Sequence, residues 1–91
     1  MAIVNRFKVG SATLAAEGSV STRWLNTPRD IVCIIDCTIF SGDITRQASV
    51  ELIRVGNHDA VGFGVNREFF WEFKNTSGVP CSIDMWMAQI I

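Results

Sequence analysis

The sequence has no tyrosine, one histidine and two prolines in 91 residues, and it has no long apolar run. The densest apolar run, Ile31 to Ile35, ends at Asp36, well short of the roughly 20 residues that a membrane-spanning helix needs. Residues 1–6 do not show a basic start followed by a long apolar stretch. We therefore expect no membrane association and no signal peptide, and we expect synthesis in the cytoplasm.

Blocks of like charge are also missing. The formal net charge is −1, and the eight Lys and Arg residues are scattered along the chain. A nucleic-acid-binding protein normally gathers its basic residues into a patch or stripe. The charge pattern therefore argues against a nucleic-acid partner.

Cysteine is too sparse for a disulfide framework, with three residues in the whole chain. Cys33 and Cys37 are expected on one strand about 13 Å apart, too far to bridge or to share a metal ion. A contact of either residue with Cys81 across strands is left open. We expect all three to be small, reduced core residues.

Patterns of catalytic residues are missing as well. His58 is expected in a turn beside Asp59, and the sequence contains no nucleophile motif for which it could act as the base. There is also no Cys-x-x-Cys motif and no acidic calcium-binding loop. Glu68 and Glu72 are expected about 13 Å apart on one strand, outside the usual glycosidase separations. We therefore expect no catalytic residue, no metal site and no cofactor, and thus no enzyme.

The strongest pattern present is an alternation of apolar and polar residues with a period of two in residues 67–91. The apolar positions are Phe69, Trp71, Phe73, Cys81, Ile83, Met85 and Met87. The two halves are joined by a polar segment containing Gly78, which is typical of an antiparallel β-hairpin. The period and Pro80 both argue against a helix.

Similar alternation predicts strands elsewhere in the chain, and no helix of ten residues can be drawn. Expected strands are residues 2–9, 19–25, 31–40 and 50–55, with a weak strand at 60–65. Residues 10–11 and 41–43 are expected to break or turn the chain, and residues 11–16 to form a strand or a helical turn. A loop or edge strand is expected at 44–49 and a loop at 56–59. Six to eight short strands separated by turns predict an all-β fold, a small antiparallel β-sandwich or jelly-roll-like barrel. Residues 1–91 then form a single domain.

The segment 31–40 is apolar on both faces. Its odd positions are all apolar, and Val32, Ile34 and Phe40 are apolar on the even side too. Such a strand is normally covered twice, by a second sheet plus a subunit or by neighbouring strands. Ile34 is therefore a candidate interface residue.

The end of the chain also carries apolar side chains on its polar face. If Cys81 and the alternate residues up to Met87 face inward, Trp86, Ala88 and Ile90 share the outward face with Asp84. A large outward apolar patch marks an interaction surface. We expect Trp86, Ala88, Ile90, Ile34 and Phe70 to form an oligomer or partner interface, while burial of Trp86 after a bulge, or a ligand platform, stays open.

A chain of this length buries roughly 60–65% of the surface that its unfolded form exposes, which makes a lone domain marginally stable, so we expect copies to complete one another as a dimer or trimer. The turn Lys74-Asn75-Thr76-Ser77-Gly78-Val79-Pro80 and the following Ser82-Ile83-Asp84-Met85-Trp86 resemble the small β-sandwich decoration (cement) and fibre-head proteins of tailed bacteriophage virions. The resemblance implies a structural protein of the virion, a homotrimer bound to the major capsid protein or other shell subunits. It also implies a capsid contact through the N-terminal segment, here Ile3, Arg6 and Lys8.

A second hypothesis is a small oligomeric carbohydrate-binding lectin. Trp24 or Trp86, with a neighbouring Asn or Asp, would then form a platform on which a glycan stacks. The absence of tyrosine counts against it, as does the lack of hydrogen-bonding side chains clustered near these tryptophans.

Overall fold

In the computed structural model, residues 3–28, 31–42, 48–59 and 66–90 are described, and the regular structure in these ranges is all β-strand. The strands are β1 (Val4–Leu14), β2 (Ser19–Pro28), β3 (Val32–Gly42), β4 (Val50–Asp59), β5 (Asn66–Asn75) and β6 (Cys81–Ile90). The all-β prediction is confirmed. The weak strand expected at 60–65 and most of the expected loop at 44–49 lie outside the described residues.

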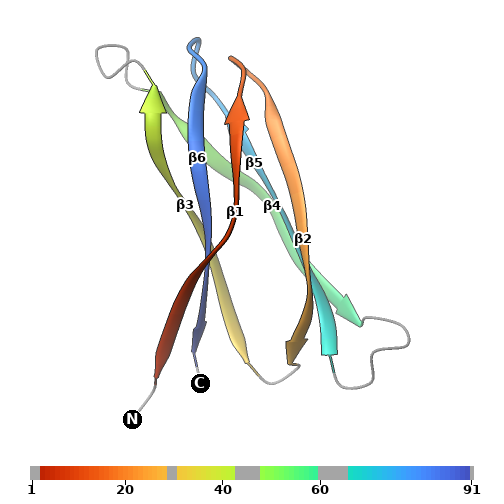
Figure 1. Ribbon diagram of the computed structural model, residues 1–91. Coiled ribbons are helices and arrows are strands. Elements are labelled where there is room, and N and C mark those ends of the chain that lie inside the picture. The colour runs from red at the N-terminus through yellow and green to blue at the C-terminus, as the bar shows by residue number, and fades with distance from the viewer. Residues whose placement is uncertain (1–2, 29–30, 43–47, 60–65, 91) are drawn as a thin grey trace.

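The strands form two antiparallel sheets of three. One has the order β1-β6-β3 and the other β2-β5-β4, so β6 and β5 are the central strands (Figure 1). Side chains from both sheets meet in one core, so the sheets pack face to face as a small sandwich. Its Cα extents of 46 × 31 × 16 Å describe a thin slab.

The predicted hairpin between residues 67 and 91 is wrong, although both of its strands exist. β5 pairs with β2 and β4, and β6 pairs with β1 and β3, so residues 76–80 carry the chain from one sheet to the other. The apolar faces of β5 and β6 therefore meet across the sandwich. The indole Nε1 of Trp71 lies 3.4 Å from Sδ of Met85 as part of this contact.

The core consists of the residues that the alternation assigned inward on these two strands, joined by a few from other strands. Its buried members are Leu14, Ile35, Phe69, Trp71, Phe73, Cys81, Ile83, Met85 and Met87. Trp71 is 1% exposed, as expected of a core tryptophan. Central strands bury their inward face most completely because neighbours flank them on both sides.

Several predicted strand ends differ from the structure. The chain does not break at Gly10: β1 runs on to Leu14, with a register shift between Lys8 and Gly10. Residues 41–42 continue β3, and residues 56–59 continue β4 where a loop was expected. In each case a glycine or polar residue is accommodated because strand pairing satisfies its backbone groups.

Candidate functional site

One side of the sandwich is apolar and open to solvent. Ile39, Leu52 and Val55 lie opposite Ile83, Phe73 and Trp71 in register, so they face the inter-sheet space. They are nevertheless 42%, 39% and 51% exposed. We call these three residues, together with the exposed Phe40 and Ile53 beside them at the register shifts of β3 and β4, the open edge.

The opposite side of the sandwich, where β1 approaches β2, is closed by aromatic rings. The ring centroids of Phe7 and Trp24 lie 5.8 Å apart between the two sheets. Both side chains are partly buried and pack against the core. The two sides therefore differ because large rings close one and shorter aliphatic chains leave the other exposed.

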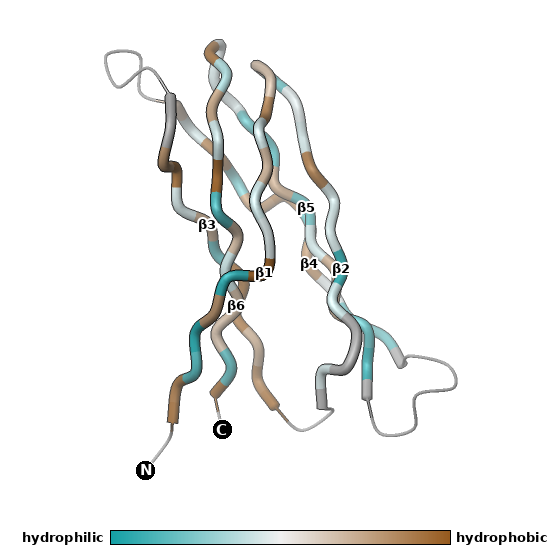
Figure 2. Tube along the Cα trace, in the orientation of Figure 1, coloured by the Kyte–Doolittle hydropathy of each residue, from teal (hydrophilic) through white to brown (hydrophobic). Residues whose placement is uncertain are grey.

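A second apolar surface lies on the outer face of the β1-β6-β3 sheet, at the end near both termini. Strand register places Val4, Ile90 and Val32 in one row and Arg6, Ala88 and Ile34 in the next. We call Val4, Val32, Ile34, Ala88 and Ile90 the terminal patch. Figure 2 shows hydrophobic colour at the start of β1 and at several places along β3. Val4, Val32 and Ile34 are its most exposed members.

Trp86 borders this patch and is held in place by its neighbours. The Arg6 guanidinium lies 4.2 Å from the centre of the indole, and the indole N–H donates to Oγ1 of Thr38 at 3.0 Å. Trp86 is half-buried on the central strand. The expected outward position is found, but Trp86 is more covered than the β3 residues beside it.

The residues expected to contact a capsid also lie at this end of the molecule. Ile3 is exposed, and Arg6 and Lys8 are on the outer face of β1. Arg6 pairs with Asp36 at 3.3 Å and Lys8 with Asp84 at 3.8 Å. These exposed ion pairs stabilise little, so a stronger acidic partner would compete for both cations at small cost.

Phe70 and Trp24 are not placed with the other predicted site residues. Phe70 lies on β5, on the outer face of the other sheet, so it shares no surface with Trp86, Ala88, Ile90 and Ile34. Trp24 lies between the sheets against Phe7. The two alternative tryptophans for a glycan platform therefore lie in different places, Trp24 half-buried between the sheets and Trp86 half-buried on the outer face of β6.

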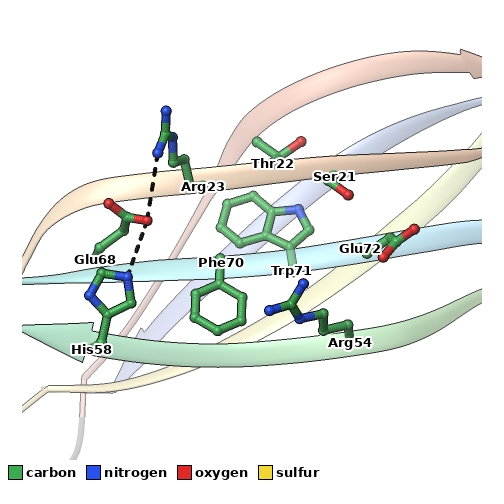
Figure 3. A pocket seen from close by; sticks show the side chains of 9 residues that line it. All are labelled: Ser21, Thr22, Arg23, Arg54, His58, Glu68, Phe70, Trp71 and Glu72. Atoms are coloured by element: carbon green, nitrogen blue, oxygen red, sulfur yellow. Dashed lines mark ion pairs between the residues drawn. The ribbon is translucent and has the colours of Figure 1, made fainter.

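The outer face of the β2-β5-β4 sheet carries a hollow and the charged residues examined for catalysis (Figure 3). His58 is on β4 and not in a turn, and its Nε2 lies 3.4 Å from Oε1 of Glu68. Glu72 lines the same hollow. Within the described ranges no three His, Cys, Asp or Glu residues are grouped closely enough to hold a metal ion.

The three cysteines are free thiols, and Cys81 is buried in the core. Burial raises the pKa of Cys81, and burial followed by the charges of Asp36 and Cys81 raises the pKa of Cys37. Both thiols are therefore protonated at neutral pH and are poor nucleophiles.

None of the described segments contains a helix long and apolar enough to cross a bilayer.

Comparison of the chain with known protein families, with curated proteins and with solved structures gives no match. The surfaces of the molecule are therefore the basis for a functional proposal.

The sequence analysis did not predict most of the open edge. In particular, it did not identify Ile39, Leu52, Ile53 and Val55 as surface residues. Two signals were present: the doubly apolar segment 31–40, and the adjacent Leu52 and Ile53 that break the alternation.

Proposed function

We propose that the protein is a structural subunit that self-associates through its open edge and decorates the shell of a virion. The observation that carries the self-association is the distribution of exposed apolar side chains. Among the described residues, nine large apolar side chains are exposed, and seven of them lie on β3 and β4. A surface concentrated in this way marks an interaction site, whereas scattered exposed residues would not.

The free energy gained by burying the open edge is large for a chain of this size. Fully burying an aliphatic or aromatic side chain stabilises by about 1.5–3 kcal/mol. Completing the burial of the five open-edge residues, each already partly covered, therefore contributes on the order of 5 kcal/mol. That is similar to the whole stability of a small domain, roughly 5–15 kcal/mol.

A second copy of the chain is the occupant we favour. In a two-fold dimer the same apolar side chains of both copies meet, whereas in a ring such as a trimer one patch of each copy meets a different patch of the next. The terminal patch is a separate exposed apolar area, to which the outer face of β3 contributes Val32 and Ile34, and it offers a partner a second contact surface. A dimer or a trimer would cover the exposed apolar side chains in one of these two ways.

The test is the mass of the full chain in solution, by light scattering and sedimentation. Val55→Lys places an ammonium in the open edge and is expected to give a monomer or loss of solubility. Thr13→Lys is the matched control, because Thr13 is an exposed β-branched residue on β1, on the other side of the sandwich. A wild-type chain that is a monomer at every concentration overturns the self-association.

The virion setting rests on the resemblance of the segment from Lys74 to Trp86, and a jelly-roll-like fold is part of the same proposal. Ile3, Arg6 and Lys8 would meet an acidic surface of the shell beside the terminal patch. Finding the chain by mass spectrometry in purified phage particles supports this role. Its absence from particles, with the assembly intact, leaves a self-associating protein of another kind.

A further inference from the structure

The outer face of the β2-β5-β4 sheet contains a hollow of about 680 Å³ that the proposed assembly does not use. Its lining residues are Ser21, Thr22, Arg23, Arg54, His58, Glu68, Phe70, Trp71 and Glu72. All three strands of the sheet contribute, and Figure 3 shows the side chains arranged around Phe70. We propose that this hollow binds a neutral saccharide unit.

The floor of the hollow is an aromatic ring held flat by a glycine. Phe70 lies opposite Gly56 in register, and a Cβ at position 56 would come within 2.5 Å of the ring. The ring therefore occupies the space that a side chain on β4 would fill. This places an apolar platform across two strands, which suits the C–H face of a pyranose ring.

Charged groups are positioned around the ring. The Arg54 guanidinium lies over the Phe70 ring, 4.9 Å from its centre, so a stacking sugar would displace it toward the edge of the ring; the His58 ring centroid lies 6.0 Å from that of Phe70. Glu68 is held between His58 at 3.4 Å and Arg23 at 3.9 Å. Its side chain is only 18% exposed, so this carboxylate is oriented before any ligand arrives.

The balance of these groups selects the ligand class. Two arginines supply only donors and two glutamates supply only acceptors, so their formal charges cancel. An anionic ligand would face both glutamates, and a cationic ligand both arginines. Sugar hydroxyls donate and accept at once, and they can bond to neighbouring Arg and Glu side chains while the ring stacks on Phe70.

The experiment is an NMR titration of the isotopically labelled full chain with neutral hexoses, N-acetylhexosamines and their disaccharides at millimolar concentration. We expect saturable shifts at the amides of Arg54, Gly56 and Phe70. Phe70→Leu keeps Gly56 covered but removes the flat aromatic face, and we expect it to weaken binding about tenfold or more. Thr13→Ala, at an exposed position on the outer face of the other sheet and outside the open edge, the terminal patch and the hollow, is the control and is expected to bind as the wild type does.

A second variant separates binding from folding. Glu72→Gln removes one charged acceptor at the surface and is expected to weaken saccharide binding without changing the amide spectrum of the core. The proposal is overturned if no saccharide in the panel shifts these signals, if Phe70→Leu binds like the wild type, or if phosphate or acetate shifts them where sugars do not. Solution mass measured on the same samples reports the assembly separately.

Discussion

At the residue scale, Asn75 joins three segments of the chain through one buried amide. Its Nδ2 donates to the carbonyl oxygens of Val79 at 2.7 Å and Ala15 at 3.1 Å, and its Oδ1 accepts from the backbone N–H of Ser77 at 3.0 Å. The side chain is fully buried, and its backbone N–H donates to the carbonyl of Gly18. This residue therefore holds the connection between the two sheets against the β1–β2 turn.

Asn75→Ala should lower the free energy of unfolding by about 2–3 kcal/mol, because it removes the hydrogen bonds that the buried amide makes with the Ala15 and Val79 carbonyls and the Ser77 N–H. Urea denaturation followed by tryptophan fluorescence measures this. Asn57→Ala, at an exposed position of β4, is the control and should stay within about 0.5 kcal/mol of the wild type. Equal effects of the two substitutions would show that the buried network contributes nothing.

Glu17 has a backbone conformation that suits glycine better. Its φ is 62°, in the turn closed by the hydrogen bond from Gly18 N–H to the Ala15 carbonyl. Glu17→Gly should be more stable than Glu17→Ala by about 1 kcal/mol, because both lose the exposed ion pair with Lys74 and only glycine relieves the left-handed strain. Thermal unfolding of the two variants gives the difference. An alanine variant as stable as the glycine variant would contradict it.

The Cys37 and Cys81 thiols should make the free energy of unfolding decrease at alkaline pH. Because the pKa values of Cys37 and Cys81 are raised above the ordinary thiol value of 9.0, the folded state disfavours the thiolate. Their contribution is complete below that value and is lost as pH rises through the higher folded-state pKa values. We expect the urea midpoint to fall as pH rises above about 9.

The chain has no tyrosine to titrate in this range, which makes the measurement cleaner. The double variant Cys37→Ala, Cys81→Ala is the control and should show a much shallower fall. A slope unchanged by the double substitution would assign the effect to the lysines.

At the element scale, the central strands differ from the edge strands in how their backbones are satisfied. β5 and β6 each pair on both sides, whereas β1, β2, β3 and β4 each pair on one. Amide hydrogen exchange should therefore be slowest along β5 and β6, with alternate fast positions along the edge strands of an isolated chain. Exchange followed by NMR measures this strand by strand. Uniform protection of β5 and β1 would contradict the strand order.

At the scale of the whole molecule, the proposed assembly links stability to concentration. If copies cover the open edge, the free energy of unfolding rises with protein concentration, by about 1.4 kcal/mol per tenfold increase for each dissociation step. Denaturation at several concentrations measures it. Val55→Lys should lose this dependence while Thr13→Lys keeps it. A wild-type midpoint that is independent of concentration would remove the support for self-association.

The alternation in the sequence by itself determined that the chain forms strands, and it determined the inward residues of β5 and β6. The predicted set from Phe69 to Met87 is buried, because a period of two specifies which face of a strand is apolar. It also placed Trp86, Ala88 and Ile90 together on the outer face of β6. The alternation specifies which face of a strand is apolar, and it does so whichever strand lies beside it.

Only the tertiary structure decided which strands pair. A hairpin and two strands stacked across a sandwich both bury the inward faces of β5 and β6, and residues 76–80 are compatible with either. The buried Asn75 network and the contact between Trp71 and Met85 hold the stacked arrangement. The hollow around Phe70 depends on that choice too, because Arg23, Phe70 and His58 meet only when β2 and β4 flank β5.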